Sequence, residues 1–397
     1  ARAIEDMKRE IGDASSNIIP TQLQQTTEEN ANAAPAIRFV NSVIERAFLE
    51  RASDIHLEPQ KGEMVVRMRI DGLLHKILTV PSNLQSTVIS RMKVMGGMNI
   101  SERKIPQDGR AMVEVRRHEI DLRISSIPTI YGEKMVIRLL DRSAGTASKQ
   151  SIGLEGKDLE KYNALLKNSS GVILIVGPTG SGKSTTMSAM ISELNSEDTN
   201  IMTLEDPVEY IHRHDRCIIS QREIPIDCPS YVSALRSALR ECPDVILLGE
   251  MRDRETMEVA MSAAETGQLL LSTLHTVGAA NTIDRIIDSF PAAQQPQIRL
   301  QLSMVLQAVV SQQLVPGVDG QPVPVFEIMF TNMAIRNMIR ESKSHQIDSV
   351  IASGGAQGMR TMDMALADLV RQKRITEETA LYYCTNYETM QKRLQLL

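Results

Sequence analysis

A glycine-rich stretch reading GPTGSGKST, residues 177–185, holds the residues whose types and spacing most clearly suggest chemistry. Its first eight residues match the pattern G-x-x-x-x-G-K-[ST] in full, after an apolar run and before a helical pattern. Glycines let backbone N–H groups turn toward phosphates, and a helix N-terminus adds partial positive charge. We therefore predict that this stretch binds ATP with Mg²⁺. The expected binding residues are Gly177, Pro178, Thr179, Gly180, Ser181, Gly182, Lys183, Ser184 and Thr185.

Two residues of this stretch have more specific expected roles. Lys183 should reach the β and γ phosphates, and the hydroxyl of Ser184 should bind Mg²⁺. The alternative is a chance glycine-rich turn. The full match, in the order strand, loop and helix, argues against that alternative.

Carboxylates follow two other apolar runs. DVILLGE ends at Glu250, which could hold Mg²⁺ through water or polarise an attacking water, or could simply cap a helix. TLEDPVEY contains Glu205, Asp206 and Glu209. Three carboxylates at one strand end repel one another, so their grouping is costly. A bound cation or a role as a general base would explain why they occur together. Glu205 is the candidate general base, with a solvated loop face as the alternative.

A histidine, His275, ends the apolar run QLLLSTLH. An imidazole there could sense the γ-phosphate or form a hydrogen bond with the acidic loop. A lone histidine at a strand end is otherwise a structural residue, and the position alone leaves both interpretations open.

Several apolar runs separated by helical patterns should position these residues. Continuous apolar runs joined by helices predict a parallel sheet covered on both faces. Before residue 142, a helical pattern and alternating stretches predict an α+β domain, with turns at Asp71-Gly72 and Asp108-Gly109. We expect a linker or mobile segment over 1–34, the α+β domain over 35–141, a hinge over 142–150, the nucleotide-binding core over 151–330 and a helical region over 331–397.

The composition narrows the class of protein. The 397 residues are 42% hydrophobic and 23% charged, and the net charge of −5 argues against a nucleic-acid partner. The longest uncharged apolar run is much shorter than the ~20 residues of a membrane span. The four cysteines form no CxxC pair, so neither zinc nor a disulfide framework is expected. Free thiols favour a reducing compartment.

Together, the motifs resemble those of the type II secretion and type IV pilus ATPases. GPTGSGKSTT resembles the Walker A motif, TLEDPVEY the Asp box, DVILLGEMRD the Walker B motif and TGQLLLSTLHT the His box. The resemblance covers nearly all of the chain after residue 34. It implies an α/β fold, with a RecA-like P-loop NTPase domain and a smaller, PAS-like α+β N-terminal domain. It also implies a homo-hexameric cytoplasmic ATPase, attached to the inner membrane through a platform protein and acting indirectly on pilin-like subunits.

The resemblance implies roles for individual residues. Glu205 is similar to the catalytic Asp-box glutamate and Glu250 to the Walker B glutamate. Arginines near a transferring phosphoryl group stabilise its charge, although ordinary salt bridges are the alternative for each. The arginines that resemble such residues are Arg123 in DLRISS, Arg138 in VIRLLD, and Arg236 and Arg240 in LRSALRECPD.

Three departures from the family pattern affect these expectations. Gln268 stands where the His box usually has its first histidine, so a role for two histidines is in doubt. Val277 stands where an asparagine is common. The stretch VPGVDGQPVPV lacks the four cysteines of the zinc loop found in secretion and many assembly ATPases, so no zinc is expected.

The N-terminal and C-terminal motifs give different indications of whether the motor assembles or retracts a pilus. ASDIHLEP, RIDGLL, SERKIPQDGR and IPTIYGEKMVIRLLD resemble the secretion and assembly branch. NTIDRIIDSFP, GMRTMDMALADL and AIRNMIRES resemble the retraction branch, in which AIRNLIRE is a signature. The local signature and the missing zinc loop favour pilus retraction. Pilus assembly or type II secretion is the first alternative, and a nucleic-acid motor or an ATP-binding scaffold is a further one.

Overall fold

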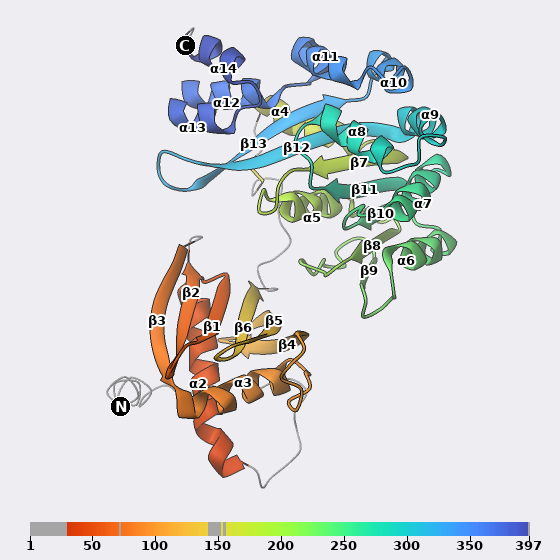
Figure 1. The fold of residues 1–397 in the computed structure, drawn as a ribbon. Coiled ribbons are helices and arrows are strands. Elements are labelled where there is room, and N and C mark those ends of the chain that lie inside the picture. Colours follow the sequence, from red (N-terminus) through yellow and green to blue (C-terminus); the bar gives the residue numbers. More distant parts are fainter. Residues whose placement is uncertain (1–29, 71–72, 142–151, 154–155, 396–397) are drawn as a thin grey trace. The chain divides into compact units, whose positions relative to one another are not determined.

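The computed structural model describes residues 30–70, 73–141, 152–153 and 156–395 (Figure 1). The chain divides into two compact units, Ala1–Ala144 and Gly145–Leu397. Residues 1–29 of the expected linker and the whole expected hinge, 142–150, lie outside the described residues. Within the described part of the chain, every helix is too short or too polar to cross a membrane.

The N-terminal unit is a six-stranded antiparallel sheet with helices on one face (Figure 1). The strand order is β3-β2-β1-β6-β5-β4. Alternate residues such as Ile55 and Leu57 face the helices, and Val43 and Ile44 lie in the same core. Its elements are α2 (Asn30–Leu49), β1 (Asp54–Pro59), β2 (Glu63–Ile70), β3 (Leu73–Pro81), α3 (Ser82–Met95), β4 (Gln107–Val115), β5 (His118–Thr129) and β6 (Gly132–Asp141).

The turn expected at Asp108-Gly109 is wrong, because both residues lie inside β4. A Cβ atom added to Gly109 would lie 2.4 Å from the carbonyl oxygen of Gly96. Glycine is therefore needed at position 109 because two backbone segments approach closely there, and not because the chain turns. The other expected turn, Asp71-Gly72, lies outside the described residues.

The C-terminal unit contains a seven-stranded sheet in the order β13-β12-β7-β11-β10-β8-β9. The neighbouring strands pair in parallel, as expected, except that β13 runs antiparallel to β12. The strands are β7 (Gly171–Val176), β8 (Ile201–Glu205), β9 (Ile219–Glu223), β10 (Val245–Leu248), β11 (Leu269–Leu274), β12 (Leu306–Pro316) and β13 (Pro322–Phe330).

Helices cover both faces of this sheet, which explains why its central strands are continuously apolar. In β7, Leu174 points into one core and its neighbours Ile173 and Ile175 into the other. The last five α-helices, α10 to α14, follow β13 along the described chain (Figure 1). The helices are α4 (Gly156–Leu165), α5 (Lys183–Leu194), α6 (Tyr231–Ala238), α7 (Arg254–Glu265), α8 (Ala279–Asp288), α9 (Gln295–Val305), α10 (Met333–Arg340), α11 (Ile347–Ser353), α12 (Met362–Arg371), α13 (Glu377–Tyr383) and α14 (Tyr387–Leu394).

One buried carboxylate ties the C-terminal helices to the sheet. Glu327 of β13 accepts a hydrogen bond from the backbone N–H of Ala279 at 2.8 Å and from that of Met362 at 3.2 Å. These two residues begin α8 and α12. N–H groups in the first turn of a helix have no partner within the helix, so one side chain satisfies two helix ends. Burial raises the pKa of Glu327, and the two N–H groups oppose that effect.

We expect Glu327→Gln to destabilise the C-terminal unit by about 1–3 kcal/mol, because the amide nitrogen of glutamine cannot accept a hydrogen bond. The backbone N–H group at the start of α8 or of α12 then loses its acceptor and stays buried. The shift of the urea unfolding midpoint measures the effect. Glu341→Gln is the matched control, since Glu341 pairs with Lys343 at 2.7 Å on the surface and should change stability little. Equal midpoints for the two variants would contradict the bridging role.

Candidate nucleotide-binding site

The glycine-rich loop joins the end of β7 to the start of α5. Gly177, Gly180 and Gly182 have φ angles of 149°, 80° and 87°, a region that other residues rarely adopt. A Cβ atom at Gly177 would also lie 2.2 Å from the carbonyl oxygen of Gln312 in β12. The backbone therefore needs glycine here for its conformation and for its packing.

The N-terminus of α5 is built to receive an anion. Its N-cap residue, Gly182, has no side chain to accept hydrogen bonds from the N–H groups of the first turn. The hydroxyl of Ser181 is buried and has no hydrogen-bond partner among the described residues. Phosphate oxygens accept hydrogen bonds from such donors, and the helix dipole favours their charge. The loop therefore fits the phosphates of a nucleotide.

Lys183 is the buried cation of the loop, with only 8% of its surface exposed. Its Nζ atom donates to the carbonyl oxygens of Gly177 at 2.9 Å and Pro178 at 3.0 Å. Burial lowers its pKa, while the charges of Glu209 and Glu250 oppose that effect. A buried ammonium group is stabilised by a nearby anion, so this side chain favours a phosphate ligand.

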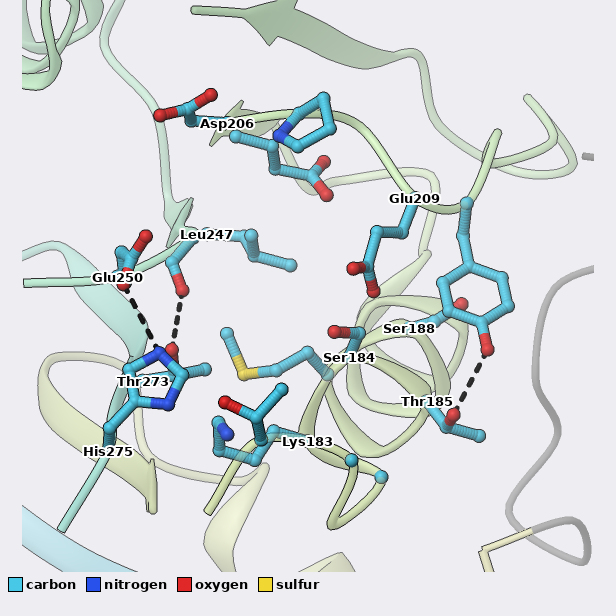
Figure 2. Close-up of a pocket in the computed structure, with 18 of the residues that line it drawn as sticks. Lys183, Ser184, Thr185, Ser188, Asp206, Glu209, Leu247, Glu250, Thr273 and His275 are labelled. Carbon is cyan, nitrogen blue, oxygen red and sulfur yellow. Dashed lines mark hydrogen bonds and ion pairs between the residues drawn. The ribbon is translucent and has the colours of Figure 1, made fainter. Parts of the chain in front are cut away.

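The loop borders a cavity of about 480 Å³, a size typical of small-molecule sites. Figure 2 shows Lys183, Ser184, Glu250 and His275 around the same space. The acidic residues come from the ends of β8 and β10, and His275 follows β11. Because these strands and β7 are parallel neighbours, their carboxyl ends meet at one edge of the sheet. The structure thus brings together the binding and acidic residues expected from the sequence.

Glu205 ends β8 and lies at the wall of the cavity. Its Oε1 atom accepts hydrogen bonds from the Thr203 hydroxyl at 2.7 Å and from the Gln221 amide at 3.4 Å. Burial raises the pKa of Glu205 to about 7, although these hydrogen bonds oppose the shift. A carboxylate with a pKa near neutrality suits a general base.

Glu250 is held from two sides. Its Oε2 atom lies 3.4 Å from Nε2 of His275, and its Oε1 atom forms an ion pair with Arg252. Arg252 also reaches Asp206, with Nη1 3.1 Å from Oδ2. The Thr273 hydroxyl donates to the carbonyl oxygen of Gly249 at 2.7 Å, which fixes the turn just before Glu250. The carboxylate is therefore oriented by the ends of three strands.

Arg236 and Arg240 are exposed on α6 and the short helix after it, and neither is among the described residues that line the cavity. Arg236 instead pairs with Glu255 of α7 at 3.2 Å. Arg123 and Arg138 belong to the N-terminal unit, where they are paired neighbours on β5 and β6. Contact of any of these arginines with a phosphate stays a prediction.

Gln268 and His275 flank β11 at its two ends. The backbone carbonyl of Gln268 accepts a hydrogen bond from Gly171, and its side chain accepts one from the Thr266 hydroxyl at 2.8 Å. Of the two His-box positions, only that of His275 therefore lies at the cavity edge of the sheet.

Several residues at the site were not singled out from the sequence, among them Tyr210, Tyr231 and Gln312. The Tyr210 hydroxyl lies 3.0 Å from that of Thr185, and Tyr231 of α6 lines the cavity. Gln312 accepts a hydrogen bond from the Thr186 hydroxyl at 2.8 Å. Tyr210 ends the TLEDPVEY motif, which is a usable signal. Gln312 lies 126 residues from its partner and carries no local signal.

The family model for type II/IV secretion system proteins matches residues 29–392. The chain belongs to this family. A type II secretion system protein E from Xanthomonas campestris is 45% identical over 277 residues, which are 70% of this chain and 48% of that protein. A twitching motility protein from Neisseria gonorrhoeae is 49% identical over 231 residues, 58% of this chain and 62% of that protein. The chain thus spans about half to three fifths of these relatives.

Two solved structures share the fold. The pilus retraction motor PilT with bound ADP is 36% identical, with a TM-score of 0.72, over 88% of this chain and 98% of that one. The ATPase DotB of Legionella pneumophila has a TM-score of 0.70 at 22% identity, over 92% of this chain and 99% of that one. The predicted α/β fold, a RecA-like ATPase domain with a smaller N-terminal domain, is confirmed.

Proposed function

We propose that this chain is an ATPase motor that drives type IV pilus retraction. The observation that supports it best is the convergence of Lys183, Glu205 and Glu250 on one cavity at the carboxyl ends of parallel strands. The similarity to the pilus retraction motor PilT with bound ADP supports both the nucleotide and the direction of work. The proposal includes a homo-hexamer, cytoplasmic and attached to the inner membrane through a platform protein, that moves pilin-like subunits.

The cavity residues divide the chemistry among them. The loop N–H groups and Lys183 bind the phosphates of ATP, and Ser184 with Glu250 holds Mg²⁺. When bound there, Mg²⁺ would neutralise charge that develops on the phosphates. Glu205 accepts a proton from the attacking water, and His275 orients Glu250 through the 3.4 Å contact.

The arginines add positive charge in this proposal. Arg123 and Arg138 of the N-terminal unit stabilise the transferring phosphoryl group. Nε of Arg138 donates to Asp54 at 3.1 Å, which orients its guanidinium group. Arg236 and Arg240 do not line the cavity of their own chain, and in the proposed ring they are assigned to the nucleotide of a neighbouring copy.

Assembly or secretion is the second candidate function. Relatives named type II secretion system protein E, and the pilus assembly ATPase PilB of Myxococcus xanthus at 40% identity over 283 residues, support it. Deletion of the gene separates the candidates. Extra surface pili would support retraction, the absence of pili would support assembly, and lost secretion with normal pili would support the secretion role. Complementation by the wild-type gene but not by Lys183→Ala would link the phenotype to the nucleotide site.

The pH dependence of turnover tests the role of Glu205. With its pKa raised to about 7, the carboxylate form becomes available only as pH rises through that value, so turnover should rise there. The Thr203 hydroxyl donates to Glu205 at 2.7 Å, and this hydrogen bond lowers the pKa of Glu205. Thr203→Val removes the hydroxyl, so the pKa should rise further. The acid limb of kcat should then move to higher pH by about one unit, which corresponds to ~1.4 kcal/mol. An unmoved acid limb would mean that another group titrates.

The same pKa shift affects stability with a definite sign. A folded-state pKa above the ordinary 4.5 of Glu205 means that the folded chain binds the proton more tightly than the unfolded chain. The stabilising contribution is therefore complete below pH 4.5 and is lost as pH rises through about 7.

A further inference from the structure

Four carboxylates, Glu205, Asp206, Glu209 and Glu250, line one cavity. Two of them are placed side by side by the sheet, because Leu204 of β8 pairs with Leu248 of β10. Asp206 and Glu250 each lie two residues beyond this pair, at the ends of parallel neighbours. Like charges in such a place repel each other and would separate without a cation between them.

Arg252 is placed to act as that cation. Its guanidinium group forms an ion pair with Oε1 of Glu250 through Nε and Nη2, and its Nη1 atom lies 3.1 Å from Oδ2 of Asp206. Glu250 is 15% exposed and Asp206 32%, whereas Arg252 is 56% exposed. One arginine therefore joins the ends of two strands with the planar fork that suits carboxylates.

The arrangement uses the two oxygens of Glu250 separately. Oε1 forms the ion pair with Arg252, while Oε2 lies 3.4 Å from Nε2 of His275. Arg252 is not among the described residues that line the cavity, although both of its carboxylate partners are. Its contact with the site therefore passes through Glu250 and Asp206, and the side chain itself approaches from outside.

We propose that Arg252 is a positioning residue for ATP hydrolysis. It clamps Glu250 to Asp206 and so fixes the direction in which the Glu250 carboxylate faces the reacting phosphate and its water. An isolated surface ion pair would contribute little, but this arginine holds a partly buried carboxylate in a cluster of like charges. The inference rests on the proposed ATPase function of the same site.

The test measures kcat, KM and the affinity for a fluorescent ADP analogue in the full chain. Arg252→Gln should lower kcat by about 100-fold, the typical effect of a misplaced catalytic group, with affinity changed by less than about threefold. Arg252→Lys, which keeps the charge, should recover at least about tenfold of that loss. Arg254→Gln is the matched control, since Arg254 is also an exposed arginine, at the start of α7, and should keep wild-type values.

A double-mutant cycle identifies the route by which Arg252 acts. Asp206→Asn should lower kcat less than Arg252→Gln, and the double variant should be no worse than Arg252→Gln alone, because the two residues share one clamp. Equal thermal unfolding temperatures show that the variants are folded.

Three results would overturn the inference. Wild-type kcat in Arg252→Gln would make the pair an inert surface contact. A larger loss of ATP affinity than of kcat would mean that Arg252 binds the phosphate directly. Fully additive losses with Asp206→Asn would exclude a shared clamp. If wild-type protein failed to hydrolyse ATP at all, the proposed function would fall, and this inference with it.

Discussion

Replacing Glu250 by Gln should lower ATP turnover by about 10³-fold while nucleotide affinity stays within a few-fold of wild type. Glutamine keeps the size of the side chain but removes the charge that attracts Mg²⁺ and polarises water, and losses of this order are typical of such groups. The ion pair with Arg252 and the contact with His275 are also weakened. Phosphate release under saturating MgATP measures the turnover, and displacement of a fluorescent ADP analogue measures the affinity.

Glu258→Gln is the matched control for this prediction. Glu258 is an exposed glutamate of α7, only eight residues further along the chain, and it does not line the cavity. Its variant should turn over ATP at the wild-type rate. Turnover retained by Glu250→Gln would contradict the assignment of the Walker B carboxylate.

Replacing Lys183 by Ala should abolish measurable turnover and weaken ATP binding by on the order of 100-fold. Hydrogen bonds to charged groups contribute about 1.5–3 kcal/mol each, and ~1.4 kcal/mol corresponds to a tenfold change in affinity. The ammonium group already lies inside the loop, held by the carbonyl oxygens of Gly177 and Pro178. To bind the phosphates, Nζ therefore needs only to exchange these carbonyl oxygens for phosphate oxygens.

The matched control is Lys167→Ala, at an exposed lysine shortly before β7. It should bind ATP like the wild type. Removal of Lys183 relieves the cost of burying a cation but leaves the carbonyl oxygens of Gly177 and Pro178 without this donor, so the unfolding temperature of the ligand-free chain should change little. A lower unfolding temperature in Lys183→Ala would mean that the lost affinity comes from lost structure.

The nucleotide site could be predicted from the sequence because its determinants are local. The stretch 177–184 specifies its own backbone through three glycines with positive φ, and the following helix begins where the motif requires. Glu205, Glu250 and His275 each end an apolar run. In a parallel sheet the carboxyl ends of strands share one edge, so the predicted parallel sheet already placed these residues at one edge, while the order of the strands came from the structure.

Other features depend on contacts between distant segments, and the sequence could not supply them. Gln312 reaches the loop because β12 is inserted beside β7, far along the chain. Gly109 is required by the carbonyl of Gly96, which a local turn signal cannot reveal. Arg236 sits in a motif that suggested a phosphate contact, yet its nearest acidic partner is Glu255 on the neighbouring helix.

The most direct test of the account is calorimetric titration of the full wild-type chain with Mg²⁺ and a non-hydrolysable ATP analogue. We expect saturable binding that requires intact Lys183, since the amide-lined loop and that ammonium group supply the charge for a triphosphate. No detectable heat of binding, or equal affinity in Lys183→Ala, would contradict the nucleotide site on which the motor proposal rests.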